Sequence, residues 1–194
     1  MIIAPARPTD LELLLAMREE AARWLASRGS DQWAKPWPDA EGMVSGVRHS
    51  IAAGAVWIVY RERQGYPVAT LTLDEWANPD LWTNEEAGEP AHYAHRMIVR
   101  REAAGADLGG ELLDWCGTRA ARAGARWLRL DAWTTNPPLH RYYLDHGFRH
   151  VRTRQLTHNP SGALFQRPAR EAPTPRLFTV EEGAPVGCGA VGRI

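Results

Sequence analysis

Hydrophobic and polar positions change their period several times along this chain, and each change predicts an element. Apolar residues at helical spacing predict helices over residues 10–29, 40–53, 108–123 and 139–146, the first capped by Thr9 or Asp10. Short apolar or alternating runs predict strands over residues 2–4, 56–61, 67–73, 92–99, 125–133, 148–156 and 163–166. Strands that alternate with helices in this way indicate an α/β fold.

One stretch, residues 92–124, joins a strand to a helix through a turn of small residues. Period-two alternation along the strand places His95 on the same face as Met97 and Val99. The turn at 103–110 reads AAGADLGG, so its backbone can come close to a ligand, and the first N–H groups of the helix suit a phosphate. Because a strand, a small-residue turn and a helix also make up any βα unit, this stretch alone does not decide a function.

Features farther along the chain complete a recognisable order. Asn136 precedes a short helix that ends with Tyr143 and the sequence LDHGF. With MIV at 97–99 and AGADLG at 104–109, these pieces have the order and spacing of the GNAT superfamily of acyl-CoA-dependent N-acyltransferases. In that family a strand L-x-V runs into R-x-x-G-x-G, and an Asn precedes a helix ending Tyr-x-x-x-Gly-Phe. The chain therefore resembles GNAT proteins over residues 2–168.

The resemblance implies a fold and a domain division. We expect one GNAT-like acetyltransferase domain over residues 1–168, with a mixed, strongly twisted central sheet that is flanked by helices and splayed at the cofactor site. Past residue 168 the composition changes to Pro, Gly and Glu with little periodicity. Residues 169–194 are thus expected to be a poorly ordered tail or to wrap on the domain, with a possible short strand at 177–180.

The resemblance also implies acetyl-CoA as co-substrate and no metal. The residues carried over to cofactor binding are Met97, Ile98, Val99, Ala104, Gly105, Ala106, Asp107, Leu108, Gly109, Gly110 and Asn136. Asn136 could instead only cap its helix. Ala104 and Asp107 depart from the family, which has Arg and Gly there. As an N-cap, Asp107 would use the N–H groups that a pyrophosphate needs, so either it rotates away or cofactor affinity is reduced.

Two residues are candidates for proton transfer. Tyr143 matches the family's general-acid tyrosine, and a phenol with a reference pKa of roughly 10 is protonated at neutral pH and can donate to a thiolate. Its alternative is a core aromatic. His95 lies where some relatives carry a catalytic base, and imidazole suits removal of a proton from an amine. A structural role is its alternative, and a bulge would change its face. Further candidate bases are His92, Tyr93, Glu75 and Asp131. A backbone N–H near Ile98 could stabilise the oxyanion.

Aromatic residues suggest where the acceptor binds. Trp33 and Trp37 lie in the link that overhangs the acceptor site in GNAT-like folds, so the resemblance implies that they shape the substrate pocket, unless they only cover the core. The long segment 74–90 either covers the acceptor or is a surface insertion. Trp33, Trp37, Trp76, Trp82 and Trp133, in or beside candidate loops, hint at a flat or apolar acceptor.

Charge and composition exclude several other classes. Lys plus Arg and Asp plus Glu are both 23, so the net charge of zero argues against a nucleic-acid partner. The basic group Arg149, Arg152 and Arg154 fits the solvated side of a strand. No apolar run approaches a bilayer span, the start does not resemble a signal peptide, and two cysteines give no disulfide framework. We therefore expect a cytoplasmic protein without a membrane partner.

Together these features predict an N-acetyltransferase that moves an acetyl group from acetyl-CoA to a primary amine of a small molecule or protein. Direct attack in a ternary complex is the implied mechanism. Two alternatives stay open: a GNAT-like domain with weakened catalysis that binds a ligand or partner, and an enzyme for a longer acyl donor. Dimers are common among GNAT proteins, so a homodimer is a further option.

Overall fold

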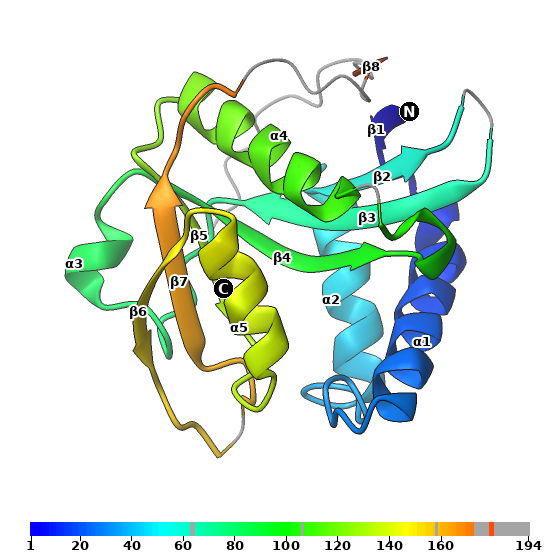
Figure 1. Cartoon of the computed structure of the whole chain (residues 1–194), viewed down its shortest axis with the longest axis horizontal. Helices are drawn as coiled ribbons and strands as arrows, with labels where there is room; N and C mark the ends of the chain where they lie inside the picture. Colours follow the sequence, from blue (N-terminus) through cyan, green and yellow to red (C-terminus); the bar gives the residue numbers. More distant parts are fainter. Residues whose placement is uncertain (63–64, 106, 158, 173–178, 181–194) are drawn as a thin grey trace.

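The computed structural model describes residues 1–62, 65–105, 107–157, 159–172 and 179–180. Within them, a mixed sheet of eight strands has the order β6-β7-β5-β4-β3-β2-β1-β8 (Figure 1). The strands are β1 Ile2–Pro5, β2 Val56–Tyr60, β3 Pro67–Asp74, β4 Ala91–Val99, β5 Trp127–Ala132, β6 Arg149–Thr153, β7 Ala163–Pro168 and β8 Thr179–Val180. The α-helices are α1 Leu11–Ser27, α2 Ala40–Ala52, α3 Asn84–Ala87, α4 Leu108–Arg122 and α5 Pro137–Asp145. The predicted α/β fold with a mixed sheet flanked by helices is confirmed.

Helices cover both faces of the sheet because the strands are apolar on both sides. Along β2, Trp57 and Val59 belong to the core under α4 and α5, whereas Val56 and Ile58 pack toward α1 and α2. The α4 stripe is the predicted one, with Leu108, Leu112, Trp115, Cys116 and Ala120 all buried. The guanidinium of Arg119 lies 4.3 Å over the ring of Trp57, so its stem belongs to the same stripe. This double-sided packing fixes the sheet between two helical layers.

The sheet opens between β4 and β5. These parallel strands pair only from Ala91 to Tyr93 on β4, whereas β3 pairs with β4 as far as Val99. Past Tyr93 the β5 side of β4 therefore has no strand partner among the described residues. The expected splay of the sheet is confirmed, and Figure 1 shows β4 running away from β5 under α4.

The connection between β3 and β4 is held by two arginines. Arg152 on β6 binds both carboxylate oxygens of Glu86, at 2.7 and 2.6 Å, and the carbonyl oxygen of Leu81 at 2.8 Å. We predicted Arg152 on the solvated side of a strand. That prediction is wrong, because Glu86 of the distant α3 segment binds its guanidinium. The second arginine, Arg129, is fully buried and pairs with Glu89.

The end of the chain is described only in part. Residues 169–172 lie along α4, where the Ala172 N–H donates to Thr118 Oγ1 at 3.0 Å and Arg122 pairs with Glu171 at 3.1 Å. Two residues of the possible strand at 177–180 form β8, which pairs in parallel with β1. The predictions for 173–178 and 181–194 fall outside the described residues, as do those for Ala106. No helix in the described ranges is long and apolar enough to cross a bilayer.

Candidate active site

A β-bulge in β4 decides which way the central side chains point. His95 pairs with Thr72 and Ile98 with Thr70, so β4 has one residue more than β3 between these pairs. Arg96, in the bulge, adopts the left-handed conformation with φ 49°. His95 therefore faces the α1 and α2 side, whereas Met97 packs against the core under α4. Our prediction that His95 and Met97 share a face is wrong, because the bulge interrupts the alternation.

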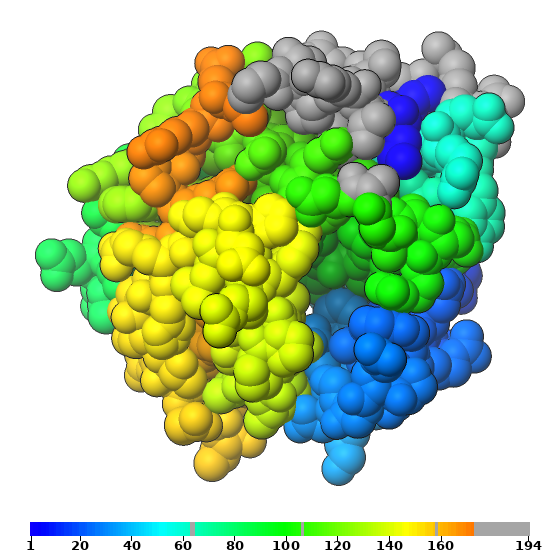
Figure 2. Space-filling view, in the orientation of Figure 1, coloured from blue at the N-terminus to red at the C-terminus, as the bar shows by residue number. Residues whose placement is uncertain are grey.

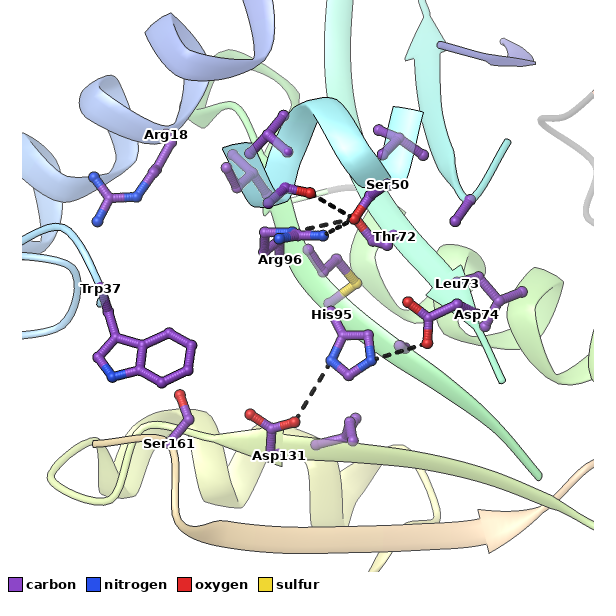
Figure 3. Close-up of a pocket in the computed structure, with 18 of the residues that line it drawn as sticks. Arg18, Trp37, Ser50, Thr72, Leu73, Asp74, His95, Arg96, Asp131 and Ser161 are labelled. Carbon is purple, nitrogen blue, oxygen red and sulfur yellow. Dashed lines mark hydrogen bonds and ion pairs between the residues drawn. The ribbon is translucent and has the colours of Figure 1, made fainter. Parts of the chain in front are cut away.

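His95 lies between two carboxylates (Figure 3). Its Nε2 is 3.3 Å from Asp74 at the end of β3, and its Nδ1 is 3.5 Å from Asp131 on β5. Burial alone would lower the pKa of His95, but Asp131 and Asp74 outweigh burial and raise this pKa to about 9. His95 is thus a cation at neutral pH, and becomes able to accept a proton only at alkaline pH.

Tyr143 approaches the same opening from α5. Its ring is 8% exposed and packs against Phe148 and Phe165, at centroid distances of 5.8 and 5.7 Å. Among the described residues none hydrogen-bonds to its hydroxyl, and burial raises its pKa. Tyr143 lines a cavity of about 1130 Å³ that His95 and Asp131 also line. A protonated hydroxyl in this cavity can donate to a leaving group, although the ring is also part of the core.

The other candidate bases are placed less favourably. Tyr93 is 2% exposed, and its hydroxyl accepts from buried Arg129 at 3.1 Å, so it is part of the core. His92 also lines the larger cavity, with Nε2 3.7 Å from Glu75, and burial lowers its pKa. It lies in the paired part of β4, before the strands separate. Asp131 stands at the opening as the partner of His95.

A second cavity, of about 900 Å³, lies between α1, the end of β4 and the start of α4. In Figure 2 the surface is hollowed between the α5 region and the α1 region. Of the residues predicted to bind the cofactor, those that line this cavity are Met97, Ile98, Val99, Ala104, Gly105, Asp107, Leu108, Gly109 and Asn136. Gly110 does not line it, because it faces the ring of His146, the residue that follows α5, where a Cβ would not fit.

Asp107 does not cap α4. Its backbone is left-handed, with φ 52° and ψ 32°, and its side chain makes no capping hydrogen bond. The carboxylate turns to α5 instead, where Oδ1 lies 3.1 Å from His146 Nε2. The expected competition for the first N–H groups of α4 is therefore absent from this structure, because His146 holds the carboxylate aside. Leu108 and Gly109 at the start of α4 line the second cavity, where the first N–H groups of the helix could bind an anion.

The loop between α1 and α2 is fastened to the loop between β5 and α5. Asp31 Oδ1 accepts from Trp133 Nε1 at 2.9 Å and from Thr135 Oγ1 at 2.6 Å, and these bonds lower the pKa of Asp31. Beside it, Asn136 donates to Gln32 Oε1 at 2.6 Å. Asn136 also caps α5, because its side-chain oxygen accepts from the Leu139 N–H at 3.1 Å. Helix capping was the alternative role that we gave for this residue. We call these contacts the loop clasp; sequence reasoning missed it because its two sides lie about a hundred residues apart.

The tryptophans divide between cavity and core. Trp33 and Trp37 line the larger cavity, and Trp33 also lines the smaller one. Trp76, which is 59% exposed, is part of the larger cavity wall too. Trp82, by contrast, is 2% exposed and packs on Tyr93. Our suggestion that Trp82 contributes to an acceptor site is therefore wrong. The site also contains two arginines that sequence reasoning did not single out, Arg18 and Arg96.

No group of three or more His, Cys, Asp or Glu side chains in the described part of the chain could hold a metal ion. The chemistry available in the larger cavity is instead that of proton donors, carboxylates and cations. The larger cavity adjoins the smaller one, which is lined by the start of α4 and by the part of β4 that has no β5 partner among the described residues. Such a pair of cavities can hold an extended anionic cofactor next to a second reactant.

Comparisons with known proteins agree with this arrangement. The model of the acetyltransferase (GNAT) family matches residues 17–148. The uncharacterized N-acetyltransferase YesJ of Bacillus subtilis is 29% identical over an alignment of 151 residues, which covers 74% of this chain and 79% of YesJ. A GNAT-family acetyltransferase from Listeria monocytogenes has a TM-score of 0.71 at 23% identity, over 86% of this chain and 94% of its own. YncA from Salmonella typhimurium, solved with its cofactor acetyl-CoA, has a TM-score of 0.58 at 17% identity, over 97% and 99% of the two chains.

The structural neighbours support the fold, and the family model, which spans more than half of the chain, supports the family. The match includes β4, α4 and α5, which contribute residues to the walls of the two cavities. The predicted resemblance is confirmed: the chain belongs to the GNAT family and is an acyl-CoA-dependent acetyltransferase.

Proposed function

We propose that this acetyltransferase moves an acetyl group from acetyl-CoA to a primary amine of a small molecule or protein, by direct attack in a ternary complex. One observation carries the proposal. The opening between β4 and β5 brings Tyr143 from the α5 side and His95 from the α1 and α2 side to one cavity. A donor for the leaving group and an acceptor for the amine proton thus face the same space.

The smaller cavity suits the cofactor. The pyrophosphate of coenzyme A would bind the first N–H groups of α4, which Asp107 leaves free. Its pantetheine arm would add to the unpaired side of β4 along Met97 to Val99, as a peptide adds to a sheet edge. The thioester would then lie at the opening, with a backbone N–H near Ile98 toward its carbonyl oxygen. YncA, which shares this fold, was solved with acetyl-CoA.

The proposed reaction balances within these residues. The amine nitrogen attacks the thioester carbon, a C–N bond forms, and the C–S bond breaks. Tyr143 gives its proton to the leaving thiolate, and the amine proton passes to His95, directly or through water. With its pKa raised to about 9, His95 is a better match for an alkylamine than an ordinary imidazole, at the cost of being mostly protonated at neutral pH.

The alternative of a binding module with weakened catalysis rested on Ala104 and Asp107. In the structure Asp107 is turned to His146, which weakens the part of that alternative that rested on Asp107. Ala104 still lacks the family's arginine side chain. We therefore favour a working enzyme whose phosphate site relies on backbone N–H groups.

Release of free thiol from acetyl-CoA, followed across a panel of primary amines, tests the proposal. We expect thiol release that depends on the amine and yields its N-acetyl product by mass spectrometry. A panel spanning apolar amines, amino acids, polyamines and peptide N-termini that gives no acetylated product at neutral or alkaline pH would contradict it.

A further inference from the structure

Arg96 places a guanidinium in the larger cavity, where the described part of the chain offers it hydroxyl groups as hydrogen-bond acceptors. Its Nε donates to Thr72 Oγ1 at 3.3 Å and its Nη2 to Ser50 Oγ at 2.5 Å. Both acceptors are neutral hydroxyls, and no described carboxylate forms an ion pair with Arg96, which is exposed and lines the cavity. Solvent reaches the side chain, but the surrounding atoms partly desolvate the guanidinium and lower its pKa, an effect that the charges of Asp74 and Asp131 oppose.

The backbone is distorted at this residue. A left-handed conformation at a residue with a Cβ is unfavourable by roughly 1–2 kcal/mol, and Arg96 adopts it at the bulge. Strain of this kind persists where the surrounding structure holds it, often at functional sites. Here the bulge turns both His95 and Arg96 to the α1 and α2 side, so adjacent residues supply the proposed base and a cation to one cavity (Figure 3).

A second arginine in the cavity is similarly placed. Arg18 of α1 donates to the carbonyl oxygens of Trp33 and Lys35, both at 3.3 Å, and forms no ion pair with a described carboxylate. Its guanidinium lies 6.0 Å from the Trp33 ring, in the wall of the same cavity. The cavity thus holds two arginines whose hydrogen-bond acceptors within the described ranges are all neutral groups.

Charge balance indicates what an acceptor must bring. The cavity is lined by the carboxylates of Asp74, Glu75 and Asp131 and by the cations Arg18, Lys35, Arg96 and protonated His95, so cations exceed carboxylates by one. A simple ammonium ion would leave an unbalanced positive charge beside Arg96. An acceptor with both an ammonium group and a carboxylate adds no net charge, and each end finds an opposite partner.

Resting on the proposed function, we infer that the acceptor is an amine with a carboxylate close to it, as in a free amino acid, and that Arg96 binds this carboxylate. The amine then lies toward His95 and Asp131, at the opening where the thioester is proposed. Trp33, Trp37 and Trp76 in the cavity wall leave an apolar surface for a large side chain. Arg96 is in this account a residue that determines specificity, beside the residues that transfer protons.

Binding of matched probe pairs to the protein saturated with coenzyme A tests this inference without requiring turnover. The pairs are L-tryptophan and tryptamine, L-phenylalanine and phenethylamine, and L-leucine and isopentylamine, titrated by calorimetry. For at least one pair we expect the amino acid to bind at least tenfold more tightly than its decarboxylated partner. In Arg96→Gln this preference falls below threefold, and in Arg96→Lys it falls between the two.

A second variant separates binding from a structural role, because Arg96 also ties the bulge to α2. Ser50→Ala removes that tie and keeps the cation, so it should keep the preference for the amino acid, and thermal unfolding checks that each variant is folded. The inference is overturned if no pair binds, if the decarboxylated probes bind as tightly, if Arg96→Gln keeps the preference, or if Ser50→Ala loses it equally.

The two proposals fail separately. Binding that favours the amino acid without any thiol release would count against the proposed function only. Acetylation of the decarboxylated amines in preference to the amino acids would leave the proposed function in place and overturn the role of Arg96.

Discussion

Nδ1 of His95 lies 3.5 Å from the carboxylate of Asp131, although their strands stop pairing two residues before His95. This contact spans the opening of the sheet, and Asp74 closes the other side of the ring at 3.3 Å. Because His95 is held as a cation between these two carboxylates, its protonation state affects the stability of the opening. The same protonation state decides whether His95 can accept a proton in the reaction.

The first prediction concerns stability against pH. Asp131 and Asp74 raise the folded-state pKa of His95 to about 9, above the ordinary histidine value of about 6.5, so its stabilisation is complete below about pH 6.5 and is lost as pH rises through about 9. The full effect is on the order of 3 kcal/mol. Urea unfolding of the wild type between pH 6 and 10 should therefore show a falling free energy of unfolding that His95→Gln lacks. Equal slopes for the two proteins would mean that the carboxylates do not hold a charged imidazole.

The rate should depend on pH through the same group. If His95 takes the amine proton, kcat/KM rises with pH and levels off above about 9, where His95 becomes neutral. The measurement needs an acceptor whose own pKa lies well below 7, such as an aromatic amine, so that the acceptor does not titrate in this range. A profile that levels off near the ordinary histidine value of roughly 6.5, or one unchanged in His95→Gln, would exclude this role.

The contact between Asp107 and His146 leads to a prediction for cofactor binding. Because the carboxylate is turned away from the α4 N–H groups and is 66% exposed, its repulsion of the cofactor is largely screened. Calorimetry should show micromolar binding of acetyl-CoA to the wild type and less than a fivefold gain in Asp107→Gly. His146→Gln frees the carboxylate to cap α4, so this variant should bind more weakly than Asp107→Gly. Binding only by the Gly variant would instead favour the binding-module alternative.

The loop clasp should control how well the acceptor is held. Asp31→Ala removes the acceptor of two hydrogen bonds, from Trp133 and Thr135, and so loosens a loop that lines both cavities. At an exposed site we expect a loss of about 1 kcal/mol, or roughly a fivefold rise in KM with a small change in kcat. Glu41→Ala, an exposed change on α2, is the control. A fall in kcat with unchanged KM would place Asp31 in the chemical step.

Local signals predicted most of the fold. Short stretches of sequence predicted the helix ends at Gly29, Gly54 and Gly124 and the apolar stripe of α4. The structure contains all of these features. The order of motifs around Asn136 and Tyr143 identified the family resemblance, and that resemblance predicted the mixed sheet and its opening. These features depend on neighbours within a few turns or on a spacing shared with a family, so a single sequence is enough to find them.

The site itself was less predictable, because long-range contacts decide it. A bulge depends on how two strands align, so nothing local at Arg96 shows that it and His95 turn to one side. Likewise, only the packing of α5 on α4 brings His146 to Asp107, and only folding brings Arg152 to Glu86. The residues that sequence reasoning placed wrongly are those whose partners lie far along the chain.

The most direct test of the proposed mechanism compares two adjacent tyrosines of α5. Tyr143 lines the larger cavity, whereas Tyr142 packs beside Gly109 in the smaller one, so Tyr142→Phe is a matched control for Tyr143→Phe. We predict that Tyr143→Phe lowers kcat about 100-fold with an unchanged Kd for acetyl-CoA, as expected for loss of a general acid, while Tyr142→Phe keeps most of its turnover. Full turnover by Tyr143→Phe, measured with the same amine and at the same pH, would contradict the assignment of the acid and with it the proposed reaction at the opening of the sheet.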